Sequence, residues 1–503
     1  MGSRMVLPVI SRIVDVSTYT STQLQSIGAI SLILLLAAAY FWLPWKQPYP
    51  GIPVIKLREK GLSKWIRPLN LQMAFRVQEL FALGRKTGKP FQVLSFSGWR
   101  IVLPHRFADE IRTNPNLTFN EILHVEFPTT LPGWEGISEG VRRDEFFTDL
   151  VHKITQCLAH ITNDLIEETD WATRKWLSDE PDWQTYELRP MGFDIVARVS
   201  TRVFAGKKLS RNDAWIRIAN EYGMTCVMAA AQIRMFPKFL WPLLNHIIPK
   251  CRSVQRQFRE ATELLLPSIE ATRKWYEQDE AKKGPKTENA IGWMIEVQKG
   301  RPMGLKNFVG AQISLSTSAL EMNFTLLGFC LIAIIEHPEV LAPLREEMIS
   351  VLRAYGSIMN RYVRKPTTLS DGTLLPAGAM LLVLDDGAKN SAFYEEPEKF
   401  IADRYLRMRQ KPGADKRHQF STVSSDNLAF GLGTHACPGR FLVHDEMKTL
   451  LTFMLLRYDW RFEPGYIRPQ VSYFEHIRIF PRDLLIQARR RTEEVDLLQP
   501  QAS

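Results

Sequence analysis

The stretch FGLGTHACPGR, residues Phe430 to Arg440, places one cysteine among three glycines, directly before a helical pattern. Gly431 and Gly433 permit tight turns in front of Cys437. The apolar spacing from Phe441 to Arg457 predicts a helix that begins just after the cysteine. Backbone N–H groups at the start of a helix stabilise negative charge, so we expect Cys437 to favour its thiolate form. A purely structural cysteine in a glycine-rich turn is the alternative.

A thiolate held in this way is the axial ligand that a cysteine-ligated haem requires. The loop matches F-x-x-G-x-x-x-C-x-G at Phe430, Gly433, Cys437 and Gly439, and so resembles the haem loop of the cytochrome P-450 family. The resemblance implies that Cys437 is the iron ligand and that Phe430 packs beside its sulfur. It also implies that His435 meets a haem propionate. Gly439, which has no side chain, would let the following helix lie close to the haem.

Further stretches carry the resemblance over nearly the whole chain. They are Ile195–Gly206, Glu336–Glu339, Leu344–Glu347, Pro397–Phe400 and Arg404–Tyr405. The resemblance implies a mainly α fold with small β-sheets, in a single haem-thiolate catalytic domain.

The nearly all-apolar stretch from Gln312 to Glu336 predicts a long central helix. In the family this helix passes over the haem and carries an acid and a threonine that relay protons to bound oxygen. Counting back from His337 places Glu321 at the acid and Met322 where the threonine would stand. Glu321 is therefore a candidate catalytic residue. A structural role for Glu321 beside a polar neighbour remains equally open.

The second departure from the family is a missing segment. The family carries Glu-x-x-Arg on a helix between the central helix and the haem loop, and no such motif lies between Glu336 and Cys437. The sequence indicates a loss near 356–357, such as a gene-model or splicing fault would produce. In the family this motif pairs with the arginine that matches Arg404. We therefore expect Arg404 to be exposed or paired with a substitute acid, and the chain to hold haem poorly.

The N-terminus predicts a membrane anchor. Residues 24–44 are mostly apolar and long enough to cross a bilayer core, with a tail at 1–23 and a proline-rich hinge at 45–53. Many more positive charges stand after the span than before it. This asymmetry predicts a lumenal tail and a cytosolic catalytic domain over 54–503. We expect a single-pass protein of the endoplasmic reticulum membrane.

Composition supports a globular, membrane-associated protein. Of 503 residues, 45% are hydrophobic and 23% charged, which excludes collagen-like and disordered classes. The net charge of +10 suits an anionic membrane surface. No long run of Lys or Arg occurs, so nucleic acid is not an expected partner. Helical periodicity dominates at 145–178, 190–206, 213–231 and 253–277, and two hairpins are expected, 91–96 with 99–102 and 367–369 with 380–383.

The expected function is that of a haem-thiolate monooxygenase. It would insert one oxygen atom from O₂ into an apolar, terpenoid-like secondary metabolite. The resemblance implies electrons from a separate NADPH-cytochrome reductase. The alternative is a catalytically impaired haem or membrane-interaction protein from a truncated gene model, since two catalytic features are altered.

Overall fold

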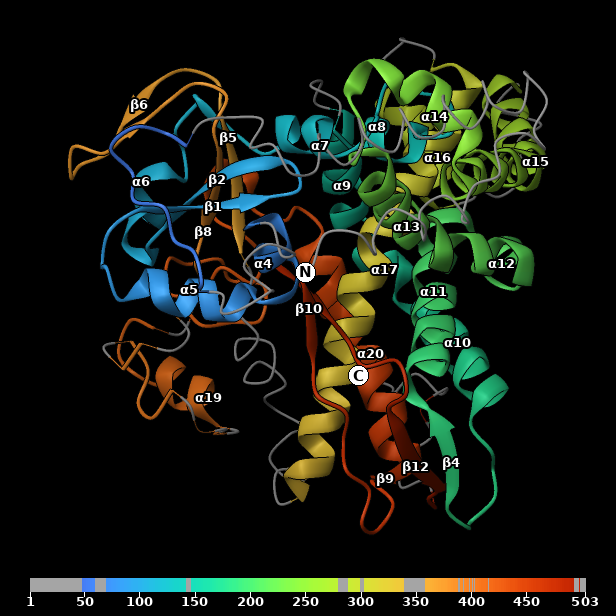
Figure 1. Ribbon diagram of the computed structural model, residues 1–503. Helices are drawn as coiled ribbons and strands as arrows, with labels where there is room; N and C mark the ends of the chain where they lie inside the picture. Colours follow the sequence, from blue (N-terminus) through green and yellow to red (C-terminus); the bar gives the residue numbers. More distant parts are fainter. Residues whose placement is uncertain are drawn as a thin grey trace, which may run out of the picture.

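The computed structural model describes residues 48–58, 69–141, 146–278, 288–298, 303–338, 358–387, 390–391, 393–397, 399, 401, 403–414, 416–492 and 497. A sheet-rich part and a helical part lie on either side of the long helix α17 (Figure 1). The helices are α4 (Leu69–Phe75), α5 (Val77–Arg85), α6 (Ala108–Ile111), α7 (Asn120–Glu126), α8 (Glu135–Ser138), α9 (Phe146–Gln156), α10 (Leu158–Trp176), α11 (Leu188–Ala205), α12 (Lys207–Ser210), α13 (Asp213–Ile233), α14 (Trp241–Ile247), α15 (Pro249–Glu277), α16 (Ala290–Val297), α17 (Leu305–Glu336), α19 (Arg404–Arg409) and α20 (Arg440–Arg457). The strands are β1 (Phe91–Ser95), β2 (Gly98–Leu103), β3 (Leu117–Thr118), β4 (Gln184–Glu187), β5 (Met359–Val363), β6 (Thr367–Thr368), β7 (Leu374–Leu375), β8 (Met380–Val383), β9 (Tyr458–Arg461), β10 (Ser472–Phe474), β11 (Ile477–Ile479) and β12 (Leu485–Arg490).

The central helix is confirmed and is longer than its apolar stretch predicts. Most side chains of α17 are buried, because α11 and α13 pack along it. Phe193 of α11 stacks on Phe324 of α17 with ring centroids 4.1 Å apart. Gly192 allows this approach, because a Cβ there would lie 2.8 Å from the Phe324 ring. The core of the helical part therefore forms around α17.

The periodic stretch predicted at 145–178 contains two helices. α9 ends at Gln156 and α10 begins at Leu158. The backbone tightens at Cys157, whose N–H is shared between the carbonyls of Lys153 (3.2 Å) and Ile154 (3.1 Å).

The main sheet has the strand order β1-β2-β8-β5-β3. The expected hairpin of β1 with β2 is confirmed. The expected pairing of 367–369 with 380–383 is wrong, since β6 pairs with β7 and β8 pairs in parallel with β2. Leu369 N–H donates to Thr373 O (2.9 Å) and closes a much tighter hairpin. All four residues of β8 are buried, so this strand belongs inside the sheet.

The end of the proline-rich hinge is attached to this sheet. Tyr49 N–H donates to the side-chain oxygen of Gln92 on β1 (2.9 Å), and Gln92 Nε2 donates to Ile52 O (2.6 Å). The expected membrane span at 24–44 and hinge residues 45–47 lie outside the described residues. Within the described ranges one helix, α17, is long and apolar enough to cross a membrane, and most of it is buried in the core.

Candidate functional site

The cysteine loop is closed by its own backbone. Cys437 N–H donates to Phe430 O at 2.7 Å, which brings the two ends of the loop together. Gly431 and Gly433 have φ angles of +69° and +72°, in the left-handed region that favours glycine. Gly439 is the N-cap of α20, so the loop presents the cysteine three residues before the first helical residue.

Two other segments hold this loop. Thr434 N–H donates to the carbonyl of Arg112, just after α6 (3.2 Å). A Cβ on Gly433 would lie 2.1 Å from that same carbonyl oxygen, so only glycine fits. From the other side, Arg361 of β5 donates through Nη2 to Leu432 O (3.1 Å). The cysteine therefore has a fixed backbone position.

The expectation that the loop favours a thiolate is only half right. Backbone N–H groups of Gly439 and Arg440 and the charge of Arg440 do act to lower the pKa of Cys437. Burial acts more strongly in the opposite direction, so the pKa of the thiol lies above its ordinary value. A cation at the sulfur would reverse this balance, because a coordinating thiol is deprotonated outright.

Cationic side chains gather around the loop. His435 and Arg361 lie close enough for the arginine charge, together with burial, to lower the pKa of the histidine. Burial lowers the pKa of Arg361 to about 10. Within the described residues, the buried Nε atoms of Arg361 and Arg440 have no hydrogen-bond partner. Such donors fit an anionic group, as the resemblance implies for His435.

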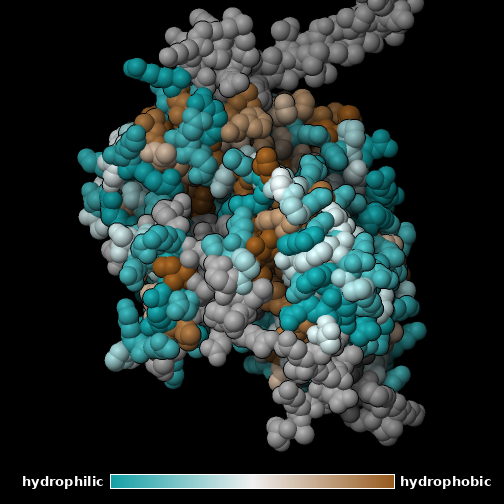
Figure 2. Space-filling model, turned by 90° about the horizontal axis from the view of Figure 1, so that it is seen from below, coloured by the Kyte–Doolittle hydropathy of each residue, from teal (hydrophilic) through white to brown (hydrophobic). Residues whose placement is uncertain are grey.

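An exposed stripe interrupts the otherwise buried α17. Ser318 and Met322, one turn apart, are exposed, and 59% of Met322 is accessible, while Leu320 and Asn323 are buried. On the loop side, a Cβ on Gly439 would meet no atom within 4 Å. Both features indicate open space where a flat group could lie. Viewed from below, apolar side chains gather along the middle of the molecule between hydrophilic flanks (Figure 2).

Glu321 lies on a different face of α17 from the buried residues Leu320 and Asn323. It pairs with Arg189 of α11. Its Oε1 is 3.7 Å from Arg189 Nη2, and 45% of its side chain is exposed. Burial raises the pKa of Glu321, and the charge of Arg189 opposes this shift. A carboxyl group with a raised pKa suits proton transfer, if α17 passes over the haem as the resemblance implies. The ion pair also suits the structural role, so both interpretations stand.

A buried polar network was not predicted. Ser200 of α11 donates through Oγ to Glu446 Oε1 (2.6 Å), and Asn323 of α17 donates through Nδ2 to Glu446 Oε2 (2.9 Å). Glu446 lies on α20 and is fully buried. The sequence did carry a signal, because Glu446 is four residues from both Leu442 and Leu450 on the apolar face of its helix. This network joins the helix of the exposed stripe to the helix after the cysteine.

Replacing Glu446 by glutamine should make the free energy of unfolding less dependent on pH. Burial raises the pKa of Glu446 from 4.5 to about 7, so the folded protein binds more protons than the unfolded chain between these values. Stability therefore falls as pH rises through this window, by up to about 3 kcal/mol. Glutamine keeps the shape and removes the charge. Urea unfolding at pH 5 and pH 8 should show the variant gaining stability only at pH 8, and equal effects at both would contradict this.

The expectation of an exposed Arg404 is wrong, since the residue is 9% exposed. Within the described residues no acid pairs with it, so the expected substitute acid stays a prediction. Its guanidinium instead donates to three main-chain carbonyls, those of Glu395, Glu396 (3.0 Å) and Lys399 (2.7 Å). Carbonyl oxygens satisfy its donors, so a carboxylate is not required to bury it. The expected loss near 356–357 lies outside the described residues.

Comparisons with known proteins agree with this geometry. A family model described as cytochrome P-450 matches residues 351–474. The chain is 30% identical to cytochrome P-450 monooxygenase bsc2 of Alternaria brassicicola, over 96% of this chain and 97% of the relative. The chain belongs to the cytochrome P-450 family. Cytochrome P-450 monooxygenase TRI1 of Fusarium sporotrichioides is 30% identical, covering 86% and 84% of the two chains.

Further relatives extend this result. Dihydromonacolin L monooxygenase LovA of Aspergillus terreus is 29% identical over 81% of this P-450 and 82% of the relative. Among solved structures, retinoic acid-bound cyanobacterial CYP120A1 superposes with a TM-score of 0.64 at 15% identity, over 88% of this chain and 100% of that one. The fold class and the haem-thiolate cofactor are confirmed, and this P-450 is an oxygen-incorporating oxidoreductase. The exposed stripe, the open space at Gly439 and the unpaired Nε donors of Arg361 and Arg440 within the described residues all fit haem.

Proposed function

We propose that Cys437 is the axial thiolate ligand of the haem and that Phe430, His435 and Gly439 complete its binding loop. The observation that carries this is the closed loop around Cys437, with its fixed backbone and the open space beside Gly439. His435, Arg361 and Arg440 would hold the anionic substituents of the haem. Phe430 would shield the sulfur from water, since its half-buried ring packs against Phe420 with centroids 5.6 Å apart.

The reaction that we propose is insertion of one oxygen atom into an apolar, terpenoid-like secondary metabolite. Bound haem supplies an iron centre that activates O₂. The exposed side chains of Ser318 and Met322 would line the oxygen- and substrate-binding side of the site. Met322 cannot donate a proton as a threonine hydroxyl would, so proton delivery would fall to Glu321. Electrons would come from a separate NADPH-cytochrome reductase.

We also propose an anchored protein, with a lumenal tail at 1–23, a membrane span at 24–44, a hinge at 45–53 and a cytosolic catalytic domain at 54–503. Attachment of hinge residues Tyr49 and Ile52 to Gln92 supports this, because it fixes the direction in which the chain leaves the sheet. Exposed apolar residues Phe239, Leu243 and Ile247, at four-residue steps, provide a surface suited to a bilayer of the endoplasmic reticulum.

The test of this function is NADPH-dependent turnover. Membranes that contain the full chain and a fungal NADPH-cytochrome reductase would be supplied with terpenoid scaffolds under isotopically labelled O₂. We expect products that contain one labelled oxygen atom, as measured by mass spectrometry. A haem-loaded protein that transforms none of the scaffolds would support the alternative, a catalytically impaired haem or membrane-interaction protein.

Replacing Glu321 by glutamine should lower the turnover number about 100-fold, because loss of a positioned acid typically costs this much. Glutamine keeps the size of the side chain but cannot carry a proton. The matched control is Glu336→Gln at the far end of α17, where the carboxylate pairs with Arg468 (3.1 Å). Rates are compared by product formation per haem, with a solvent deuterium isotope effect. Equal rates in the two variants would favour the structural role of Glu321.

A further inference from the structure

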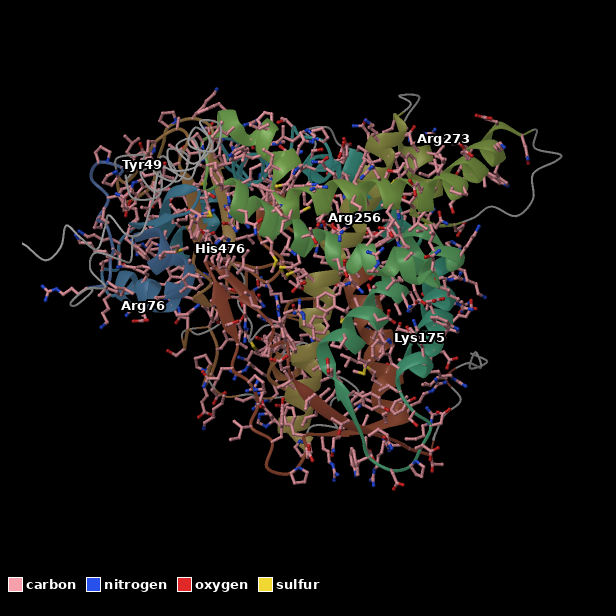
Figure 3. All side chains as sticks on the ribbon, turned by 45° about the vertical axis from the view of Figure 1, so that its right-hand side comes forward. Tyr49, Arg76, Lys175, Arg256, Arg273 and His476 are labelled. Atoms are coloured by element: carbon pink, nitrogen blue, oxygen red, sulfur yellow. The ribbon has the colours of Figure 1, made fainter. Side chains whose placement is uncertain are left out.

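A cluster of ionisable side chains lies where four segments of the fold meet. Arg100 is on β2, Glu126 ends α7 and Arg234 directly follows α13. Glu475 and His476 form the turn between β10 and β11. In Figure 3, His476 lies between Tyr49 and Arg76 of the sheet-rich part and Arg256 of the helical part. These five residues are called the turn cluster below.

Arg100 is the most deeply buried member of the turn cluster. Its exposed fraction is 0%, and its Nη2 forms an ion pair with Glu126. Its Nε donates to Ser95 Oγ at 3.1 Å. Its third nitrogen, Nη1, has no hydrogen-bond partner within the described residues. A buried donor left unsatisfied costs about 1–3 kcal/mol, so a bound acceptor would recover free energy here.

The other members converge on the turn between β1 and β2. Arg234 Nη1 donates to Ser97 Oγ (2.5 Å), and Phe96 N–H donates to Glu475 Oε1 (3.0 Å). His476 Nδ1 is buried and has no partner within the described residues. The turn cluster therefore contains an unpaired donor on Arg100 and an unpaired ring nitrogen on His476, which donates in the tautomer that carries its proton on Nδ1.

The positive and negative charges of the turn cluster cancel, but not every hydrogen-bond donor in it has an acceptor. The positive charges of Arg100 and Arg234 keep the pKa of Glu475 below its ordinary value despite burial. Burial and the same two arginines lower the pKa of His476 to about 4, so its ring is neutral at physiological pH. Two guanidinium groups thus face two carboxylates, Glu475 and Glu126. Serine hydroxyls and the Ala230 carbonyl satisfy further donors of the two groups, and Nη1 of Arg100 stays buried without a partner within the described residues.

Apolar side chains surround the turn cluster and connect it to the central helix. Phe75 is 68% exposed and packs edge-on against Phe474 of β10, with centroids 6.2 Å apart. Met235, next to Arg234, is 41% exposed. Phe480, directly after β11, packs against Phe324 of α17, with ring centroids 4.9 Å apart. The four residue steps from His476 to Phe480 span about 13 Å at the rise of a β-strand.

We propose that the turn cluster binds the carboxylate of an otherwise apolar substrate, through Arg100, Arg234 and His476. A carboxylate offers up to four acceptor positions and matches a guanidinium in a bidentate manner. The apolar skeleton would extend along β11 toward α17. This inference rests on the proposed function and names the substrate class of that site.

The test compares dodecanoate with methyl dodecanoate, which has the same alkyl chain and no charge. Binding to the purified full chain is measured by isothermal titration calorimetry, before and after loading with haem. We expect dodecanoate to bind at least about 10-fold more tightly, since hydrogen bonds to a charged group are worth about 1.5–3 kcal/mol. Arg234→Met should weaken dodecanoate binding about 10- to 100-fold and leave the ester within about twofold.

Two further variants separate recognition from packing. His476→Phe keeps a ring in the turn and should weaken dodecanoate binding about 10-fold. Arg256→Met, on the exposed face of α15, is the matched control and should change neither affinity. Equal affinities for acid and ester, no binding of either, or an Arg234→Met variant with a lower Tm but an unchanged preference would each overturn the proposal. A carboxylate preference without a haem-thiolate spectrum would instead retain this proposal and reject the proposed function.

Discussion

Replacing Cys437 by alanine should abolish the haem-thiolate absorbance of the reduced, carbon-monoxide-treated protein and reduce oxygen insertion to background. Alanine removes the only sulfur in the loop, while the backbone bond from residue 437 to Phe430 O remains possible. Within the described residues, no cluster of three or more His, Cys, Asp or Glu could hold a metal in its place. The fold should therefore survive, and far-ultraviolet circular dichroism should be unchanged.

The matched control is Cys157→Ala, because Cys157 is also half-buried and, like Cys437, is not in a disulfide. It lies between α9 and α10, outside the loop. We expect its carbon-monoxide spectrum and its product formation to equal those of the unmodified chain. A Cys437→Ala protein that retained the haem-thiolate spectrum would disprove the assignment of the iron ligand.

Replacing Gly433 by alanine should lower the free energy of unfolding by about 3 kcal/mol, from the left-handed backbone and the overpacking together. The φ angle is +72°, and the new Cβ would lie 2.1 Å from the Arg112 carbonyl oxygen. Backbone atoms cannot move aside as a side-chain end can, so the loop or α6 must shift. Urea unfolding measures the loss, and the carbon-monoxide spectrum shows whether haem is still held.

Gly413→Ala separates the two causes. Gly413 also has a positive φ angle, +74°, but a Cβ there would meet nothing within 4 Å. In this variant only the left-handed backbone conformation is unfavourable. The free energy of unfolding should therefore fall by about 1 kcal/mol. If the free energy of unfolding fell equally in both alanine variants, the contact with Arg112 would make no contribution to the effect.

The parts of the site that the sequence predicted are local in the chain. The loop from Phe430 to Gly439 needs only its own residues to turn, so its glycine spacing was sufficient. The long apolar run of α17 and the hairpin of β1 with β2 were predictable for the same reason, because periodicity reports each element separately. The resemblance to the family followed from the haem loop and from further short stretches of the chain.

The parts that the sequence did not predict depend on distant partners. β8 was assigned to a hairpin with its chain neighbour, whereas burial on both faces places it beside β2. Glu446 binds Ser200 and Asn323, which are 246 and 123 residues away. A single sequence does not reveal which helices will supply such partners. The turn cluster was missed because its members come from four separate segments.

The carbonyl bonds of Arg404 make this part of the protein tolerant to change. Every residue type has a main-chain carbonyl, so substitutions at 395, 396 and 399 would leave the acceptors of the guanidinium in place. What must be kept is the path of the backbone, including Glu396 with its φ angle of 43°. Related sequences can therefore diverge in composition along this segment while its length stays the same, and insertions or deletions there would be the changes that selection removes.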